Sequence, residues 1–372
     1  MSHFKNKIKL IIITPSLKIG GSQRVIMYLC KYLDAKKFDI TLLIINNQNK
    51  DSSFSVQPLK NIKIIDLKKT RVRNAILNIV KVIKVVKPDV VLSTQYHLNT
   101  AMLFVKLFIP SSIKMIARET NIPSKRLERN KLLLQNIIYR KFYKNFNSVI
   151  CQSKGMKEDL KNVFKIKKDK LVIINNPIDC NAIINKEKSE ENSFYKSDII
   201  AIASTLGHIK GLERLIDSIA LMNIKNIKLI ILGDGNSKNM LNEKIKKLKL
   251  HNQINLVGLQ KDPVKFMQNT KVLAISSYAE GFPNTMLEAG LCGIPTVSFN
   301  IEGVKDILIE GMNGFLVPDG SLKEFAESLL KAIDYPFNKM QIQNHIRNNY
   351  NIEKIIKKYE NLFIDSYNNK GC

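Results

Sequence analysis

The sequence predicts an α/β protein made of two doubly wound domains, and three observations lead to this prediction. At 372 residues the chain exceeds the length at which a single hydrophobic core usually stops growing. Short, apolar, β-branched runs alternate with segments whose apolar residues recur at helical spacing. The alternation stops at a polar stretch, 185–197, and then starts again. We therefore expect domains at 1–180 and 198–350, and a helix at 351–372 that packs back toward the first domain.

In the first half, apolar runs that end in turn residues indicate strands. The run 9–14 ends at Pro15, and from Gly20 onward apolar residues recur at helical spacing. The same criteria predict strands at 40–45, 62–67, 90–93, 114–117 and 148–152, and helices at 71–86, 100–108 and 127–144. Strands separated by helical crossovers form a parallel sheet that is covered on both faces.

The second half repeats this pattern after the polar stretch, which we interpret as a linker. The predicted strands are 199–204, 228–233, 255–257, 272–276 and 295–299, and the predicted helices are 211–222, 238–248, 284–292 and 322–332. Sheets of this kind bind ligands at the carboxyl ends of their strands. The functional residues are therefore expected in the loops that follow the strands.

The charge of the chain is unevenly distributed. Of the formal net charge of +27, residues 1–180 carry +24 and residues 181–372 carry +3. Such a field attracts nucleic acid, anionic lipid or phosphorylated substrates. Biased base composition of the coding sequence is an alternative source of lysine, although it does not explain the asymmetry. No recognition helix, aromatic stacking platform or zinc module is found, so a nucleic-acid partner is not expected.

The segment 125–144 combines an apolar face with seven basic residues, which is typical of a helix at a membrane surface. An ordinary surface helix docked on the sheet would show the same pattern. The five cysteines have no paired or metal-binding spacing, no run of 18 apolar residues occurs, and the first apolar run is too short for a signal peptide. These features predict a cytoplasmic protein with reduced thiols.

The most informative segment is 280–289, Glu-Gly-Phe-Pro-Asn-Thr-Met-Leu-Glu-Ala. Asn284 is a suitable helix cap, so backbone N–H groups near the helix start would form an anion site that suits a diphosphate. Glu280 and Glu288 would lie on either side of it and accept hydrogen bonds from sugar or ribose hydroxyls. The alternative is one exposed loop glutamate and one that stabilises the helix.

Further turns at strand ends fit the same kind of ligand, although each by itself also fits an ordinary loop. Gly20-Gly21 between strand and helix would let a phosphate approach the backbone through positive φ angles, and Gly233 follows another strand. Lys210 opens a helix and could meet a pyrophosphate, and His97 follows the strand 90–93. Neither a Gly-x-Gly-x-x-Gly fingerprint, a phosphate-loop lysine nor an Asp-x-Asp pair is present, so no redox cofactor, ATP or metal ion is expected.

Taken together, these residues resemble glycosyltransferase family 4, a family of retaining enzymes with the GT-B fold of two facing Rossmann-like domains. The resemblance covers nearly the whole chain. It rests on the segments 20–24, 153–156, 176–179, 210–211, 233–235 and 280–297.

The resemblance implies a role for each matching residue. Glu280 would meet the donor sugar, Glu288 the ribose, His97 the transferred sugar and Lys210 the diphosphate. The remaining donor contacts would come from Gly20, Gly21, Gly233, Phe282, Pro283, Asn284 and Thr285, with the base near Gly258. In this family the leaving phosphate oxygen is thought to help deprotonate the acceptor, so catalysis consists mainly of positioning and charge stabilisation.

One position departs from the family pattern. An arginine is usual five residues before the lysine of Lys-Gly, and here that position is Thr205. We expect Arg214 or Arg118 to substitute for the missing cation. We expect transfer of a hexose or N-acetylhexosamine, with a nucleotide sugar as donor, UDP-linked by preference. The acceptor would be a polyprenyl-diphosphate-linked glycan at the inner face of the cell membrane, in surface-polysaccharide synthesis. A catalytically weak relative that binds polyanions or membranes is the alternative, and an epimerase or phosphorylase fits the motifs less well.

Overall fold

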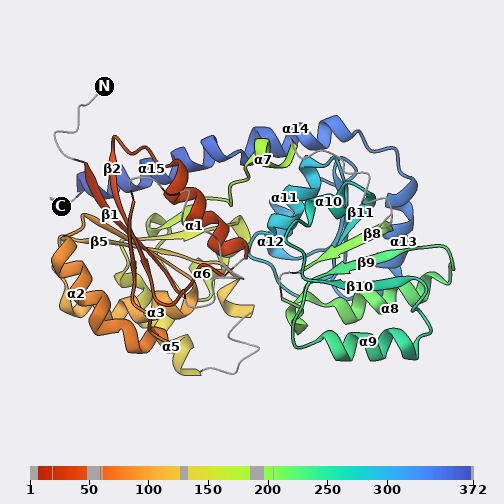
Figure 1. The fold of residues 1–372 in the computed structure, drawn as a ribbon, viewed down its shortest axis with the longest axis horizontal. Helices are drawn as coiled ribbons and strands as arrows, with labels where there is room; N and C mark the ends of the chain where they lie inside the picture. The colour runs from red at the N-terminus through yellow and green to blue at the C-terminus, as the bar shows by residue number, and fades with distance from the viewer. Residues whose placement is uncertain are drawn as a thin grey trace. The chain divides into compact units, whose positions relative to one another are not determined.

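The structure is a computed structural model, and it describes residues 7–18, 20–47, 59, 62–125, 133–184, 197–203 and 205–369. The chain forms two compact units (Figure 1). Unit 1 comprises Met1–Pro177 and Ile352–Cys372, and unit 2 comprises Ile178–Asn351. Ile178, which we expected in the first domain, belongs to unit 2 because it forms a β-bridge with Asn351 and donates its N–H to the Tyr350 carbonyl.

Unit 1 contains a seven-stranded, parallel sheet. Its strand order is β3-β2-β1-β4-β5-β6-β7, in which the order reverses beside β1 as in a doubly wound fold. The strands are β1 (Ile8–Thr14), β2 (Phe38–Ile44), β3 (Lys63–Asp66), β4 (Val90–Thr94), β5 (Lys114–Arg118), β6 (Ser148–Cys151) and β7 (Leu171–Ile173).

Helices cover both faces of this sheet. They are α1 (Gly21–Tyr32), α2 (Ile76–Val86), α3 (Tyr96–Val105), α5 (Leu133–Phe142), α6 (Lys154–Asn162) and α15 (Ile352–Asn368), with the short 3-10 helices η2 (Val72–Ala75), η3 (Lys106–Phe108), η4 (Tyr143–Asn145) and η5 (Lys168–Lys170). Alternate residues of β1 serve the two faces: Ile11 and Ile13 join the core under α2 and α3, whereas Leu10 and Ile12 join the core under α1 and α15.

Unit 2 contains a six-stranded, parallel sheet in the order β10-β9-β8-β11-β12-β13. Its strands are β8 (Ser197–Ile202), β9 (Leu229–Leu232), β10 (Ile254–Gly258), β11 (Thr270–Ile275), β12 (Thr296–Phe299) and β13 (Gly314–Val317). Its helices are α7 (Cys180–Ile184), η7 (His208–Lys210), α8 (Leu212–Met222), α9 (Lys238–Lys247), α10 (Val264–Met267), α11 (Asn284–Leu291), α12 (Glu302–Lys305), α13 (Leu322–Asp334) and α14 (Lys339–Tyr350). The prediction of two doubly wound domains is confirmed.

The structure differs from the predicted elements in a few places. The strands β7 and β13, which span three and four residues, were not predicted. The predicted helix 127–144 corresponds to α5 and η4, and its residues 127–132 lie outside the described part of the chain. Most of the expected linker, 185–196, also lies outside it. Within the described ranges, no helix has the length and apolar character needed to span a bilayer.

Candidate functional site

Two loops meet at the carboxyl edge of the unit 2 sheet. The first follows β8 and ends in η7, and the second follows β11 and leads to α11. They are joined by hydrogen bonds from the Tyr278 N–H to the Ile209 carbonyl (2.9 Å) and from the Ser276 hydroxyl to the Lys210 carbonyl (3.1 Å). Gly211 permits this approach, since its φ is +57° and a Cβ there would lie 2.1 Å from the Ser276 carbonyl oxygen.

Lys210 and Glu280, which we expected to contact different parts of a donor, are bonded to each other. The Lys210 Nζ donates to the Glu280 Oε1 at 2.7 Å, and the Ser277 hydroxyl donates to the same oxygen at 2.7 Å. The Glu280 side chain is 13% exposed and the Lys210 side chain 27%. Glu280 thus presents a fixed, partly exposed carboxylate whose second oxygen is available as an acceptor for hydroxyl groups.

Arg214 does not provide the substitute cation that we expected. Its guanidinium donates to the Ser276 and Ser277 carbonyls and to the Asp319 carboxylate, and only 7% of its side chain is exposed. The rings of Tyr278 and Phe299 lie 4.1 and 4.0 Å from its central carbon. Arg214 therefore holds the backbone of the loop that precedes Glu280. Sequence reasoning could not see this role, because the partner carbonyls are more than 60 residues away.

The start of α11 lies directly after this loop. Phe282 and Pro283 are buried, whereas Asn284 and Thr285 are half-buried. Pro283, and not Asn284 as we expected, occupies the cap position, and Asn284 is the first helical residue. The first N–H groups of a helix have no partner within the helix, so they can bind an anion. Glu288 lies further along α11 and is only 3% exposed, so only a small part of its side chain could contact a ligand.

The remaining predicted residues of unit 2 surround the turn after β8. The Gly233 N–H donates to the Gly258 carbonyl at 2.8 Å, and a Cβ at Gly233 would lie 1.9 Å from the Ala203 carbonyl oxygen. The turn after β9 is held to the β8 loop by the Leu206 N–H, which donates to the Asp234 carbonyl at 2.8 Å. Thr205 is exposed in that loop. The structure thus brings Gly233, Gly258 and the loop of Thr205 together.

Gly303 of α12 is a site residue that sequence reasoning missed, and no local sequence signal marks it. A Cβ at Gly303 would lie 2.2 Å from the Glu280 carbonyl oxygen. We expect Gly303→Ala to lower the free energy of unfolding by about 1–3 kcal/mol, because the backbone at Glu280 must move. Urea unfolding measures this change, with Gly207→Ala as the control, since a Cβ at Gly207 meets nothing within 4 Å. Equal effects of the two variants would show that Gly303 does not hold Glu280.

In unit 1, α1 begins at Gly21, and Gly20 occupies its cap position. Gly20 has φ 178°, which is extended backbone, so the expected need for a positive φ is wrong at this position. The first turn of α1 nevertheless lies at the carboxyl edge, where the Ser22 hydroxyl is 3.5 Å from that of Thr94 at the end of β4. The start of α1 is therefore a second helix start at a carboxyl edge, within its own unit.

Arg118, the other expected substitute cation, is completely buried beneath this turn. Its guanidinium donates to the Asn176 Oδ1 (2.6 Å) and the Tyr359 hydroxyl (3.0 Å), and at longer range to the hydroxyls of Thr94 (3.3 Å) and Ser22 (3.4 Å). Direct contact of Arg118 with a ligand does not fit this burial. Its charge instead adds positive potential below the start of α1.

His97 is exposed in the first turn of α3, directly after the carboxyl end of β4. The preceding Gln95 has φ 71° and ψ 141°, a strained conformation for a residue other than glycine. Its N–H donates to the Arg118 carbonyl at 3.3 Å. The ring of Tyr96 stacks on Tyr139 of α5, with centroids 5.3 Å apart. The start of α3, and with it His97, is thus fixed from two sides.

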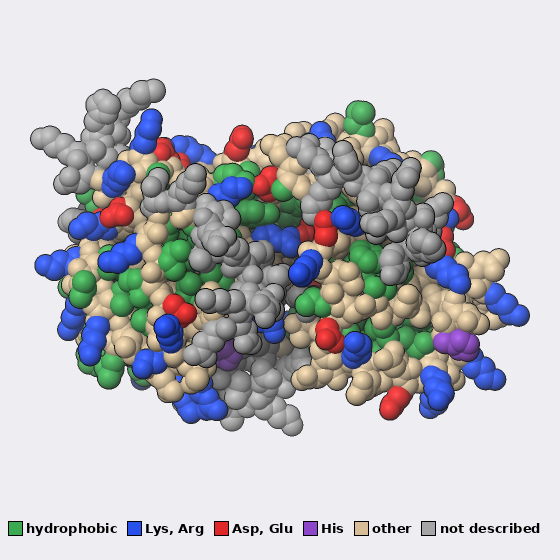
Figure 2. Space-filling model, in the orientation of Figure 1, with side chains coloured by type: hydrophobic (Ala, Val, Ile, Leu, Met, Phe, Trp, Pro, Cys, Tyr) green, Lys and Arg blue, Asp and Glu red, His purple; other side chains and the backbone are tan. Residues whose placement is uncertain are grey.

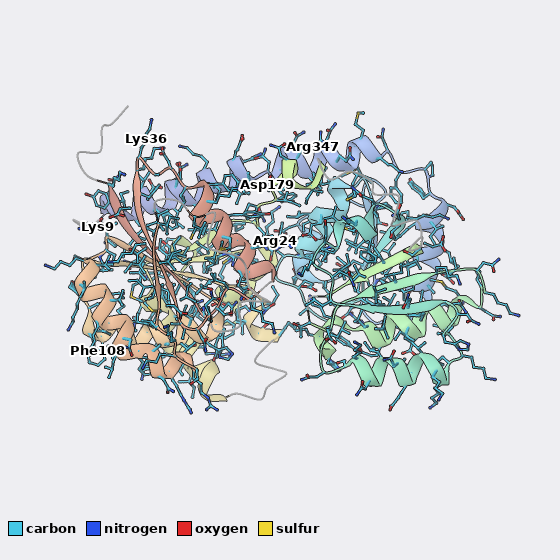
Figure 3. The ribbon with its side chains drawn as sticks, viewed as in Figure 1. Lys9, Arg24, Lys36, Phe108, Asp179 and Arg347 are labelled. Carbon is cyan, nitrogen blue, oxygen red and sulfur yellow. The ribbon has the colours of Figure 1, made fainter. Side chains whose placement is uncertain are left out.

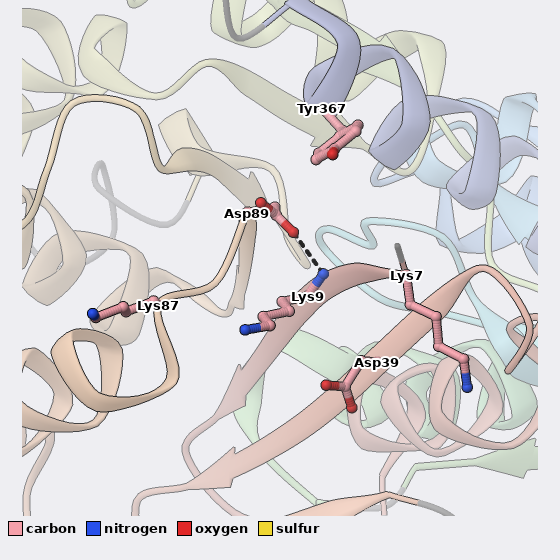
Figure 4. A pocket seen from close by; sticks show the side chains of 6 residues that line it. All are labelled: Lys7, Lys9, Asp39, Lys87, Asp89 and Tyr367. Carbon is pink, nitrogen blue, oxygen red and sulfur yellow. Dashed lines mark hydrogen bonds between the residues drawn. The ribbon is translucent and has the colours of Figure 1, made fainter. Parts of the chain in front are cut away.

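A hollow of about 700 Å³ lies at the opposite edge of the unit 1 sheet, where β1, β2 and β4 begin (Figure 4). Its lining residues are Lys7, Lys9, Asp39, Lys87, Asp89 and Tyr367. The Lys9 N–H donates to Asp89 at 2.7 Å, as the dashed line in Figure 4 shows. None of the predicted site residues lines this hollow, and ligands of doubly wound sheets bind at the other edge.

Comparison with known proteins gives consistent matches over both units. The family model described as Glycosyltransferase Family 4 matches residues 19–182, and that described as Glycosyl transferases group 1 matches residues 184–361. An uncharacterized glycosyltransferase of Methanocaldococcus jannaschii is 33% identical over 251 residues, which cover 63% of this chain and 61% of that protein.

One further relative and one solved structure align over most of this chain. The N-acetylgalactosamine-N,N'-diacetylbacillosaminyl-diphospho-undecaprenol 4-alpha-N-acetylgalactosaminyltransferase of Campylobacter jejuni is 28% identical over 326 residues, 83% of this chain and 86% of that protein. The crystal structure of Anabaena HepE in complex with UDP and glucose superposes with a TM-score of 0.81 at 17% identity, covering 96% of this chain and all of that chain. That structural likeness concerns the fold.

Proposed function

We propose that this protein moves a hexose or N-acetylhexosamine from a UDP-sugar to a lipid-linked glycan with retention of configuration. The chain belongs to glycosyltransferase family 4 and is therefore a transferase. The observation that carries this proposal is the Glu280 carboxylate. It is held by Lys210 and Ser277 beside the start of α11. A carboxylate next to a set of helix N–H groups matches a ligand with hydroxyls at one end and a diphosphate at the other.

In the proposed reaction, the bond between the anomeric carbon and the diphosphate oxygen breaks, and a bond to the acceptor oxygen forms on the same face of the sugar. The acceptor proton goes to the leaving diphosphate. Glu280 orients the sugar through its hydroxyls, and the N–H groups of Asn284 and Thr285 stabilise the diphosphate. The family resemblance assigns Glu288 to the ribose and His97 to the transferred sugar. Because no net oxidation occurs, the reaction needs no redox cofactor.

Two observations support a lipid-linked acceptor in bacterial surface-polysaccharide synthesis. The Campylobacter relative is named for a substrate linked to diphospho-undecaprenol. The net charge of residues 1–180 is +24, which favours an anionic membrane surface. We accordingly place the protein in the cytoplasm, at the inner face of the cell membrane.

A second candidate is a catalytically weak relative that binds membranes or polyanions, and Thr205 favours it. If the missing cation limits the reaction, Thr205→Arg should raise kcat about tenfold or more, because hydrogen bonds to charged groups are worth about 1.5–3 kcal/mol. Steady-state release of UDP measures the change. Thr205→Gln is the control for side-chain length. A Thr205→Arg variant no faster than the parent would show that the absence of a cation here does not limit turnover.

The proposed function is tested with a panel of UDP- and GDP-sugars, assayed by nucleotide release in the presence of a polyprenyl-diphosphate-linked glycan. We expect one UDP-sugar to be used in preference to the others, and the anomeric configuration of the product to match that of the donor. A protein that neither binds nor turns over any of these donors would refute the proposal and favour the second candidate.

A further inference from the structure

We propose that the outer face of α2, α3 and η3 binds the surface of an anionic lipid bilayer. This α2–α3 face consists of the outward side chains Leu77, Lys81, Lys84, Val85, Phe104, Leu107 and Phe108. The inference deepens the proposed function by naming the surface that would meet the membrane, and it rests on that function. The segment 125–144, which the sequence indicates as a membrane-surface helix, lies partly outside the described residues and stays a prediction.

The apolar side chains of this face are large and unusually exposed. Val85 is 79% exposed and Leu107 75%, while Phe104 and Phe108 are each about half exposed. The two helices contact each other, so their outer residues belong to one side of unit 1. Figure 3 shows Phe108 on the outer side of these helices, across the sheet from Lys36. An exposed set of Phe, Leu and Val side chains marks an interaction surface.

The charge of the face defines the kind of partner. Residues 67–117 contain nine Lys and Arg but only one acidic residue, Asp89, whose carboxylate accepts the Lys9 N–H. Basic side chains surround the apolar ones on this part of unit 1 (Figure 2). Cations around an apolar centre match anionic headgroups above acyl chains.

The lysines near η3 strengthen this argument. Lys106 is half-buried, and its Nζ donates to the Asn145 carbonyl. Burial and the neighbouring charges of Lys170 and Lys114 lower the pKa of Lys106. The nearest acidic residue in sequence to Lys170 is the exposed Asp169. Lys114 and Lys170 are likewise half-buried and donate to backbone carbonyls, Lys114 to Asn369 and Lys170 to Lys144 and Phe146, so these three lysines add positive potential beside the face rather than forming part of it.

The position of the face suits a lipid-linked acceptor. His97 lies at the first turn of α3 and Phe108 at the end of η3, and a helix of this length spans about 15 Å. Contact of the α2–α3 face with headgroups would therefore hold the carboxyl edge of unit 1 close to the membrane surface. A glycan on a lipid diphosphate could then reach His97 without leaving the bilayer.

The test is sedimentation of the full chain with vesicles of phosphatidylcholine, alone or mixed with phosphatidylglycerol. We expect binding to the mixed vesicles only. Lys81→Gln/Lys84→Gln should weaken it about 30-fold, because each lysine near an anionic surface contributes about 1 kcal/mol. Leu107→Asp/Phe108→Asp should weaken it at least about tenfold, because each loses the burial of a large apolar side chain.

Matched controls lie in unit 2: Lys246→Gln/Lys247→Gln change two exposed lysines, and Leu221→Asp/Met340→Asp change two large apolar residues that are more than half exposed. These should bind as the parent does, and all variants should unfold at the parent temperature. Equal losses in the controls, or face variants that bind normally, would overturn the proposal. The proposal would also be overturned if the parent protein formed a dimer that only the face variants disrupt, because the face would then bind a second copy of the chain. The vesicles carry no donor or acceptor, so this outcome does not depend on glycosyl transfer.

Discussion

Glu280→Gln is expected to lower kcat about 10- to 150-fold with little change in KM for the donor, since hydrogen bonds to charged groups are worth about 1.5–3 kcal/mol. The amide keeps the shape of the carboxylate but loses its charge. In the structure that carboxylate is held by Lys210 and Ser277, each at 2.7 Å. If Glu280 orients the sugar as the bond to the diphosphate breaks, the loss appears in turnover. Initial rates of UDP release over a range of donor concentrations measure both constants.

Two comparisons sharpen this result. Glu243→Gln changes an exposed glutamate of α9 and should leave both constants unchanged. Glu288→Gln should mainly raise KM, because we assign Glu288 to the ribose and not to the reacting sugar. If Glu280→Gln raised KM while kcat stayed constant, Glu280 would bind substrate and transition state equally, and its proposed role would be wrong.

Arg214→Met is expected to lower the free energy of unfolding by about 2–5 kcal/mol, because it leaves two buried carbonyl groups without their donor. These carbonyls belong to Ser276 and Ser277, directly before the segment that carries Glu280. Methionine also removes the cation that lies between the rings of Tyr278 and Phe299. The partner Asp319 is half exposed, so its ion pair contributes little to the expected change.

Urea unfolding followed by circular dichroism measures the change in stability, and amide hydrogen exchange at 276–280 shows where it arises. Arg71→Met, at an exposed arginine of unit 1, should alter neither. We expect faster exchange in the loop of the Arg214 variant even under conditions where both units stay folded. Unchanged exchange at 276–280 would mean that other contacts hold this loop and that Arg214 does not position Glu280.

The segment 280–289 shows how far the sequence alone could lead. The order of strand, glycine and proline turn, and helix start follows from residues that are neighbours in the chain, so its position at the end of β11 was predictable. Its partners were not. Lys210 is 70 residues from Glu280 in the chain. Arg214 is 62 and 63 residues from the two carbonyl groups that it binds, so no local pattern in the sequence predicts these contacts. The predicted helix start was also wrong by one residue, because Pro283, and not Asn284, occupies the cap position of α11.

By itself, the sequence determined the two doubly wound sheets, the strand ends at which the predicted site residues lie and the family motifs, because the periodicity of apolar residues records which side of each element is buried. Only the tertiary structure decided that Lys210 binds Glu280, that Arg214 and Arg118 are held within the protein, and that α2 and α3 carry the exposed apolar face. The physical reason is common to all three. Hydrogen-bond partners and solvent exposure depend on which loops and helices meet in space, and that is set by the packing of each whole unit.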